Sequence, residues 1–151
     1  MVPPARDPVL ELLHDHEDLN ELVRSVGDTV RAANDPDAAA LAAQLVELRE
    51  QMFLHFAREE EGAFPFIAAV LPEVADEVTT MLHAHDAVCG AVARMIHAVR
   101  AGQVEQTRTL FDRFELAYTL HARAERLFLQ GLVGRLAPED ARQLAELVST
   151  V

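Results

Sequence analysis

Two H-x-x-x-E pairs constrain this chain more than any other feature of its sequence. His55 and Glu59 form the first pair, and His121 and Glu125 repeat the same spacing. On an α-helix, residues four apart project from one face, one turn from each other. An imidazole and a carboxylate placed in this way can bind one metal ion or reach two neighbouring ions. Because the motif occurs twice, and lone histidines stand in other apolar segments, we predict a metal site.

The rest of the chain predicts helices throughout. Apolar residues recur in alternating steps of three and four, and no segment shows the sustained alternation of a strand. Helix breakers and N-capping residues separate these apolar runs into four long helices and a short fifth. We expect the first helix to run from Asp7-Pro8 to about Ala33, the second from Asp35-Pro36 to between Gly62 and Pro65, and the third from Leu71-Pro72 to Ala101-Gly102. The fourth helix is weakened near Gly131 and Gly134, and the fifth runs from Ala137-Pro138 to about Val148.

Four amphipathic helices with short connections predict an all-α fold, an antiparallel up-down-up-down four-helix bundle with a short C-terminal fifth helix. We place the bundle at about residues 8–133 and the last helix at about residues 138–148, within a single domain spanning residues 1–151. Half of the 151 residues are hydrophobic, which is enough for one compact core.

Composition also excludes several classes of function. The formal charge of −12 argues against nucleic acid and against anionic membranes as partners. No apolar run approaches the length of a transmembrane helix, and the acidic N-terminal segment does not resemble a signal peptide, so we expect a cytoplasmic protein. Cys89 is the only cysteine, which excludes an internal disulfide and a thiolate cluster. We expect it to be a core residue.

Each of the four long helices has polar residues on its otherwise apolar stripe. Ionised carboxylates in such positions are costly unless they are paired or bind metal. In an antiparallel bundle all of these side chains lie roughly 8–18 Å from the same end, so they can converge in one layer of the core. They are His16 on the first helix, His55 and Glu59 on the second, His85 on the third, and His121 and Glu125 on the fourth.

Four imidazoles and two carboxylates exceed the needs of one structural zinc ion. They suit two first-row ions bridged by carboxylates, and imidazole favours iron over magnesium or calcium. Two alternatives stay open at this point. One is a set of core residues that satisfy each other by hydrogen bonds, and the other is a structural zinc or mixed-metal bundle.

The same residues resemble the hemerythrin-like, HHE cation-binding family over roughly Pro8 to Val133. The resemblance implies a non-haem, oxo-bridged di-iron site. In it, the four histidines would be terminal ligands, and Glu59 and Glu125 would be the bridging carboxylates. The residues that carry it are Asp15-His16, His55-x-x-x-Glu59-Glu60 followed by Phe64-Pro65, the lone His85, and His121-x-x-x-Glu125.

Two positions differ from the oxygen-carrying hemerythrins. These carriers have a second histidine one turn before the third-helix histidine, where this chain has Met81, and H-x-x-x-x-D in place of the second H-x-x-x-E. Six ligands leave one iron short of a donor, which a neighbouring side chain or water would supply. Tyr118, three residues before His121, is a candidate iron ligand. The alternatives are a hydrogen bond to a carboxylate or solvent, or simple packing.

Two classes of function follow from this metal centre, and the sequence leaves open whether the protein is an enzyme. One is a di-iron protein that reacts with hydrogen peroxide or related reactive oxygen or nitrogen species, catalase-like or peroxidase-like. The other binds dioxygen or nitric oxide reversibly, or senses or stores iron, without turnover. The missing histidine argues against an oxygen carrier. If Tyr118 binds iron, its anionic phenolate would stabilise ferric iron, for which peroxide is a natural reactant. We expect small-molecule partners and no catalytic residue beyond the metal centre, and the sequence leaves any protein partner open.

Several other polar residues are expected outside the site. His14 and His83 each lie two positions from a stripe histidine and therefore point away from it, and His97 is expected on the surface. Glu60 and Glu61 continue an acidic run and are expected on a solvated face, with support of a ligand as the alternative for Glu60.

Overall fold

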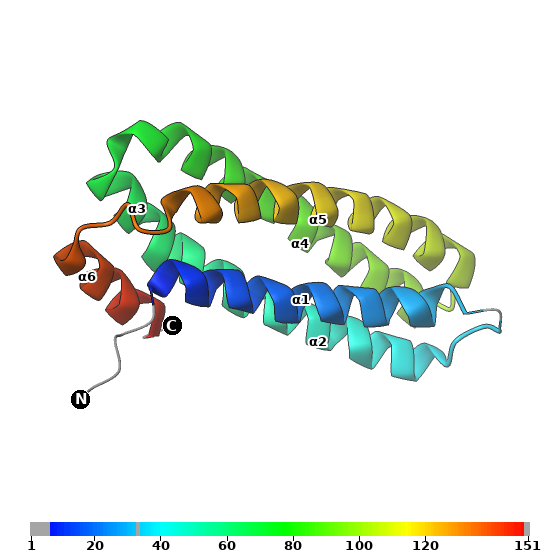
Figure 1. Ribbon diagram of the computed structural model, residues 1–151. Coiled ribbons are helices and arrows are strands. Elements are labelled where there is room, and N and C mark those ends of the chain that lie inside the picture. Colours follow the sequence, from blue (N-terminus) through cyan, green and yellow to red (C-terminus); the bar gives the residue numbers. More distant parts are fainter. Residues whose placement is uncertain (1–6, 33, 150–151) are drawn as a thin grey trace, which may run out of the picture.

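The computed structural model of this chain describes residues 7–32 and 34–149, and every regular element within these ranges is helical (Figure 1). This confirms the all-helical prediction. Within the same ranges, no helix combines the length and apolar character needed to cross a membrane. The elements are α1 (Pro8–Val30), α2 (Ala38–Ala57), the π-helical segment η1 (Arg58–Ala63), α3 (Phe64–Val70), the 3-10 turn η2 (Pro72–Val74), α4 (Ala75–Arg100), α5 (Val104–Leu132) and α6 (Pro138–Ser149).

Four long helices lie side by side along one axis, and the short α6 packs across one end of them (Figure 1). α1 contacts α2 and α5, and α4 contacts α2 and α5, so that four neighbouring pairs enclose a common interior. α6 contacts η1, α1 and α3. The apolar stripes of the long helices therefore face one another, as their sequence periodicity requires.

Capping explains where the first two helices begin. The Asp7 side chain accepts a hydrogen bond from the Val9 backbone N–H at 2.9 Å, and Pro8 occupies the first turn. The second helix starts later than predicted, because Asp37 is the cap, accepting from Ala39 N–H at 3.0 Å. The predicted start at Asp35-Pro36 is therefore wrong. α1 ends at Val30, before the predicted limit at Ala33, which lies outside the described residues.

The predicted end of the second helix, between Gly62 and Pro65, is also wrong. The chain continues through η1 into α3 and reaches Val70. In η1 the helix widens, and the Phe64 N–H bonds to the carbonyl of Glu59, five residues earlier. Pro65 then falls in the first turn of α3, where a proline is tolerated. The predicted limits of the third helix agree with η2 and α4, and α4 ends before Gly102, whose φ is 73°.

The buried polar residues divide the core into two apolar clusters. On α1, His16 lies between Leu12 in one cluster and Leu19 in the other. On α4, His85 lies in the same way between Met81 and Val88. The polar side chains thus form a single layer across the bundle, as the sequence predicts.

Candidate metal centre

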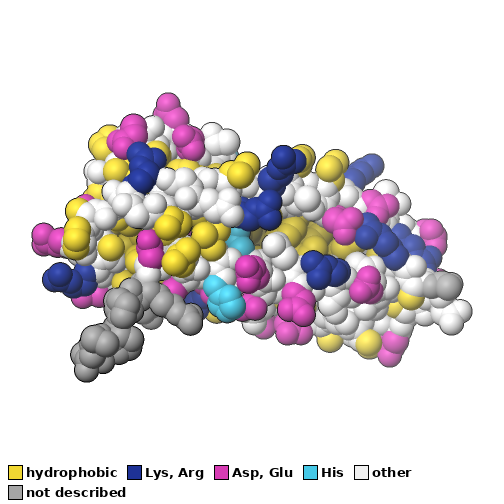
Figure 2. Space-filling view, in the orientation of Figure 1, with side chains coloured by type: hydrophobic (Ala, Val, Ile, Leu, Met, Phe, Trp, Pro, Cys, Tyr) yellow, Lys and Arg dark blue, Asp and Glu magenta, His cyan; other side chains and the backbone are white. Residues whose placement is uncertain are grey.

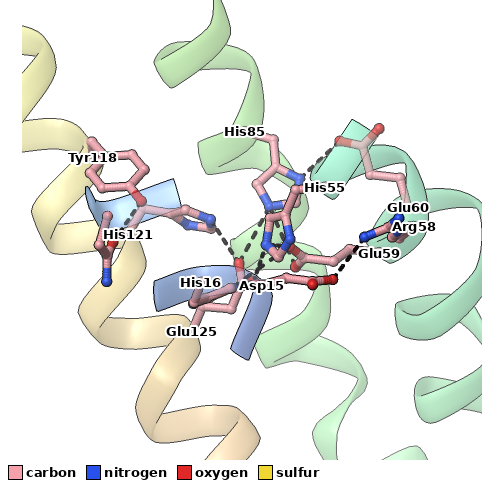
Figure 3. A network of polar contacts seen from close by, with 11 residues as sticks. Asp15, His16, His55, Arg58, Glu59, Glu60, His85, Tyr118, His121 and Glu125 are labelled. Carbon is pink, nitrogen blue, oxygen red and sulfur yellow. Dashed lines mark hydrogen bonds and ion pairs between the residues drawn. The ribbon is translucent and has the colours of Figure 1, made fainter. Parts of the chain in front are cut away.

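Six polar side chains meet in this layer, and none is more than 7 % exposed. Their rings and carboxylates point toward one another from four different parts of the chain (Figure 3). The structure thus brings together all six residues that the sequence predicts as ligands. His16 comes from α1, His55 from α2, Glu59 from η1, His85 from α4, and His121 and Glu125 from α5.

Glu125 lies at the centre and presents its two oxygens to different histidines. Its Oε1 is 2.5 Å from His16 Nε2 and 3.5 Å from His55 Nε2. Its Oε2 is 2.7 Å from His121 Nε2 and 3.4 Å from His85 Nε2. The donors therefore form two groups that share this carboxylate. Donor atoms within each group lie within 4.8 Å of one another, and the groups are His16, His55, Glu59 and Glu125, and His85, His121 and Glu125.

Glu59 also reaches both sides of the layer. Its Oε1 makes a close contact with His55 Nε2 and lies 3.9 Å from His16 Nε2. Its Oε2 lies 3.9 Å from His85 Nε2, in the second group. Glu59, like Glu125, therefore reaches histidines of both groups.

Several of these atoms are close to one another without forming hydrogen bonds. Both oxygens of Glu59 and the Nε2 atoms of His55 and His121 have no hydrogen-bond partner, although all are buried. An unsatisfied buried carboxylate costs folding free energy unless another interaction compensates for it. Donor atoms directed at a common point instead of at each other are the arrangement expected of metal ligands. The residues present therefore fit a pair of cations, and imidazole with carboxylate is a suitable donor set for iron.

The π-helical segment η1 places a further carboxylate beside this layer. Glu60 Oε1 lies 3.0 Å from His85 Nδ1, the nitrogen that faces away from the other donors. The Phe56 ring stacks on His85 with the centroids 3.8 Å apart. A carboxylate in this position fixes the orientation of a metal-binding imidazole. Glu60 is exposed, as predicted, and its contact with His85 gives it in addition the supporting role that was the alternative.

Burial and mutual contact shift the protonation of the cluster. Burial lowers the pKa of His16, but the hydrogen bond with Glu125 and the nearby Glu59 carboxylate outweigh burial and raise this pKa to about 9. Burial, with the neighbouring Glu125, raises the pKa of Glu59 well above its ordinary value. Burial also acts to raise the pKa of Glu125, but its close contacts with Glu59 and three histidines outweigh burial and hold that pKa well below its usual range. These opposite shifts favour the protonated form of Glu59 and the ionised form of Glu125.

Tyr118 takes a position beside the centre. It is 5 % exposed, and its hydroxyl donates a 2.6 Å hydrogen bond to Asn20 Oδ1 on α1. Burial, followed by the charges of Glu125 and Glu59, raises the pKa of Tyr118, so the hydroxyl keeps its proton. This geometry favours a hydrogen-bonding role over iron ligation. The sequence does not mark Asn20, which lies four residues after His16. Its role depends on the contact with Tyr118 of α5, which only the fold reveals.

A small cavity of about 10 Å³ lies next to the donors. It is lined by the histidines at positions 16, 55 and 121, by Tyr118, and by the apolar side chains of Leu19, Phe56 and Ala122. A space of this size is comparable to that of one water molecule. It limits what can approach this side of the centre to very small molecules.

Residues that the sequence places outside the site are exposed as expected. His14, His83 and His97 are all on the surface, and the His14 side chain is 64 % exposed. Met81, which stands where the oxygen carriers have a histidine, is buried in an apolar cluster one turn before His85. Cys89, which we expect to be a core residue, is only partly buried and packs against the core.

Comparisons with known proteins agree with this centre. A protein-family model described as the hemerythrin HHE cation binding domain matches residues 7–132, which include all six donors. Comparisons with curated proteins and with solved structures find no significant match. The matched region is most of the chain and ends before α6. The chain therefore belongs to the hemerythrin HHE cation-binding domain family.

Proposed function

We propose that this protein is a non-haem di-iron protein that reacts with hydrogen peroxide or related reactive oxygen or nitrogen species, in a catalase-like or peroxidase-like manner. The observation that carries the proposal is the position of Glu125, whose two oxygens face two separate groups of histidines. A single structural ion would need only one group of donors. The reaction is inferred from Met81, which leaves the second group without the extra histidine of oxygen carriers.

The donor groups divide the ligands between two ions. His16, His55, Glu59 and Glu125 would hold the first ion, and His85 and His121 would hold the second together with Glu125. Glu59 Oε2 is the additional donor on the side of His85. Iron bound in this way would supply Lewis acidity and redox chemistry to a small reactant.

Other residues of the chain prepare the site for this chemistry. Glu60 orients His85, and the aromatic rings of Phe56 and Phe64 stack on His85 and keep bulk water away. The cavity beside Tyr118 admits a molecule about as large as water. These features support a small reactant such as hydrogen peroxide, and they disfavour an organic substrate at this position.

The second candidate function is reversible binding of dioxygen or nitric oxide, or iron sensing or storage, without turnover. The apolar side chains of Leu19, Phe56 and Ala122 in the cavity wall favour it, because an uncharged diatomic molecule needs few polar contacts. Both candidates use the same donors. We further propose the antiparallel up-down-up-down order for the four long helices, which their short connections and neighbour contacts support.

The test uses the purified full-length protein loaded with iron. We expect two iron ions per chain, near-ultraviolet absorption and evolution of dioxygen from hydrogen peroxide, measured with an oxygen electrode. E125Q should abolish the evolution, whereas H97Q, a change at an exposed histidine of α4, should preserve it. Reversible dioxygen binding by the reduced protein, without turnover of peroxide, would favour the second candidate. A colourless zinc protein would contradict both candidates.

A further inference from the structure

A groove of about 440 Å³ runs between α1 and α2 and has His55 in its wall. Of the six residues in the metal centre, His55 alone lines this groove. Four carboxylates line it as well, from Asp15, Asp18 and Glu21 on α1 and from Glu47 on α2. The groove thus connects an acidic surface with one residue of the buried layer.

The net charge of the groove is negative. Asp15 pairs with Arg58 at 2.9 Å, so these two charges offset each other. Asp18, Glu21 and Glu47 form no ion pair with any part of the chain that the structure describes. Figure 2 shows acidic side chains gathered over the middle of α1. Three uncompensated carboxylates that line one groove attract cations and raise their local concentration.

His55 provides the second observation at this groove. Its side chain is only 5 % exposed, and its Nδ1 has no hydrogen-bond partner. Metal-binding histidines usually donate their other ring N–H to an acceptor, as His85 does to Glu60. The unpartnered Nδ1 leaves the His55 ring less firmly held than the His85 ring.

The groove on the opposite side of α1 carries unpaired positive charges instead of negative ones. A second groove, of about 750 Å³, lies between α1 and α5 and has His16 and Tyr118 in its wall. Its arginines at positions 24, 123 and 126 have no ion-pair partner within residues 7–32 and 34–149. Of its two carboxylates, Glu115 pairs with Arg31, and Glu17 lies 3.6 Å from His14. A cation is therefore favoured on the α2 side of α1 and disfavoured on the α5 side.

We propose that the α1/α2 groove is the uptake site for metal, where Asp18, Glu21 and Glu47 bind a divalent cation transiently before it passes to the centre beside His55. This inference rests on the proposed function, because it presupposes a metal centre in the buried layer. It adds a separate, reversible cation-binding site on the surface. Hard carboxylate oxygens that are not preorganised suit such weak, exchanging binding.

The experiment follows metal uptake by the full-length metal-free protein. Co²⁺ is the probe, because its visible absorption changes on coordination, and stopped-flow mixing gives the rate constant for uptake. The triple variant D18N/E21Q/E47Q should take up Co²⁺ about tenfold more slowly, and its rate should depend less on salt concentration. The final amount of bound Co²⁺ should equal that of the wild type, since no residue of the centre is changed.

The matched control is the triple variant D28N/E50Q/E77Q, which loses the same charge at exposed residues outside the groove. It should take up Co²⁺ nearly as fast as the wild type. A second variant, Q51R, adds a positive charge at an exposed residue of the groove wall and should also slow uptake. Circular dichroism verifies that each variant is folded.

Equal slowing in the two triple variants would show a general effect of net charge and would overturn the uptake site. Unchanged rates in D18N/E21Q/E47Q and Q51R would overturn it too. Both outcomes leave the metal centre intact, provided that the final stoichiometry is normal. Failure of the wild type to bind Co²⁺ or iron would instead contradict the proposed function, and the uptake site with it.

Discussion

The backbone of Gly62 in η1 lies directly against Leu147 of α6. A Cβ atom added at Gly62 would lie 3.2 Å from the carbonyl oxygen of Leu147. Only glycine allows this close approach without a shift of backbone atoms. Through this contact α6, which lies outside the family match, braces the π-helical segment that carries Glu59 and Glu60.

We therefore expect G62V to disturb both the fold and the centre. The added side chain would separate α6 from η1 and lower the free energy of unfolding by about 1–3 kcal/mol. Because Glu59 lies in the same segment, the variant should also bind metal more weakly. Urea unfolding of the metal-free protein and a metal titration measure the two effects.

G131A is the control for this prediction. A Cβ atom at Gly131, in the helix α5, would meet no heavy atom within 4 Å. Alanine should therefore stabilise the helix by roughly 0.5–1 kcal/mol. If G62V unfolds at the same urea concentration as the wild type, α6 does not brace η1.

The shared position of Glu125 predicts unequal roles for the two carboxylates. E125Q should lose both metal ions, because this carboxylate belongs to both donor groups. E59Q should keep at least one ion, because the group of His85, His121 and Glu125 does not include Glu59. Metal analysis after gel filtration gives the number of ions per chain. Retention of both ions by E125Q would contradict the assignment of Glu125 as the shared ligand.

The sequence predicts the helices well where local signals and tertiary packing agree. The cap at Asp7 and the stop at Gly102 are examples, since the Asp7 side chain accepts from a backbone N–H two residues on and Gly102 adopts a positive φ. The second helix was predicted less well for two reasons. Asp35 and Asp37 are equally suitable N-caps, because both are aspartates. Gly62 and Pro65 predict a helix end, because glycine and proline usually mark one. The helix continues because it widens at η1, which places Pro65 in the first turn of α3, and α6 packs on this segment.

The site could be predicted to a similar extent. Its six donors are recognisable because each interrupts an apolar stripe, so that the periodicity alone marks them. Glu60, Asn20 and Arg58 lack such a signal, because they lie off the stripes. Their partners His85, Tyr118 and Asp15 are on other helices, and only the packing of the bundle brings them together.

The raised pKa of His16 predicts how the stability of the metal-free protein depends on pH. The pKa is about 9 in the folded protein and 6.5 for an ordinary histidine, so the folded state binds the proton more tightly. This stabilisation is fully present below pH 6.5 and is lost as the pH rises through 9. The loss should amount to up to about 3 kcal/mol.

Urea unfolding at several pH values tests this dependence. H16Q should remove most of it, whereas H14Q, at an exposed position two residues away, should behave like the wild type. Glu59 acts in the same direction, because its raised pKa also favours proton binding by the folded state. A pH-independent free energy of unfolding between pH 6.5 and 9 would contradict the prediction.

The hydrogen bond from Tyr118 to Asn20 gives a test of the role of this tyrosine. Y118F and N20A each remove the bond, and each should lower the free energy of unfolding by about 1 kcal/mol. If the hydroxyl stays on Asn20 when iron is bound, Y118F should leave the visible spectrum of the iron-loaded protein unchanged. A tyrosinate bound to ferric iron would instead give a broad visible band. A band that disappears in Y118F but persists in N20A would show that the phenolate binds iron directly, because N20A removes the partner and keeps the hydroxyl.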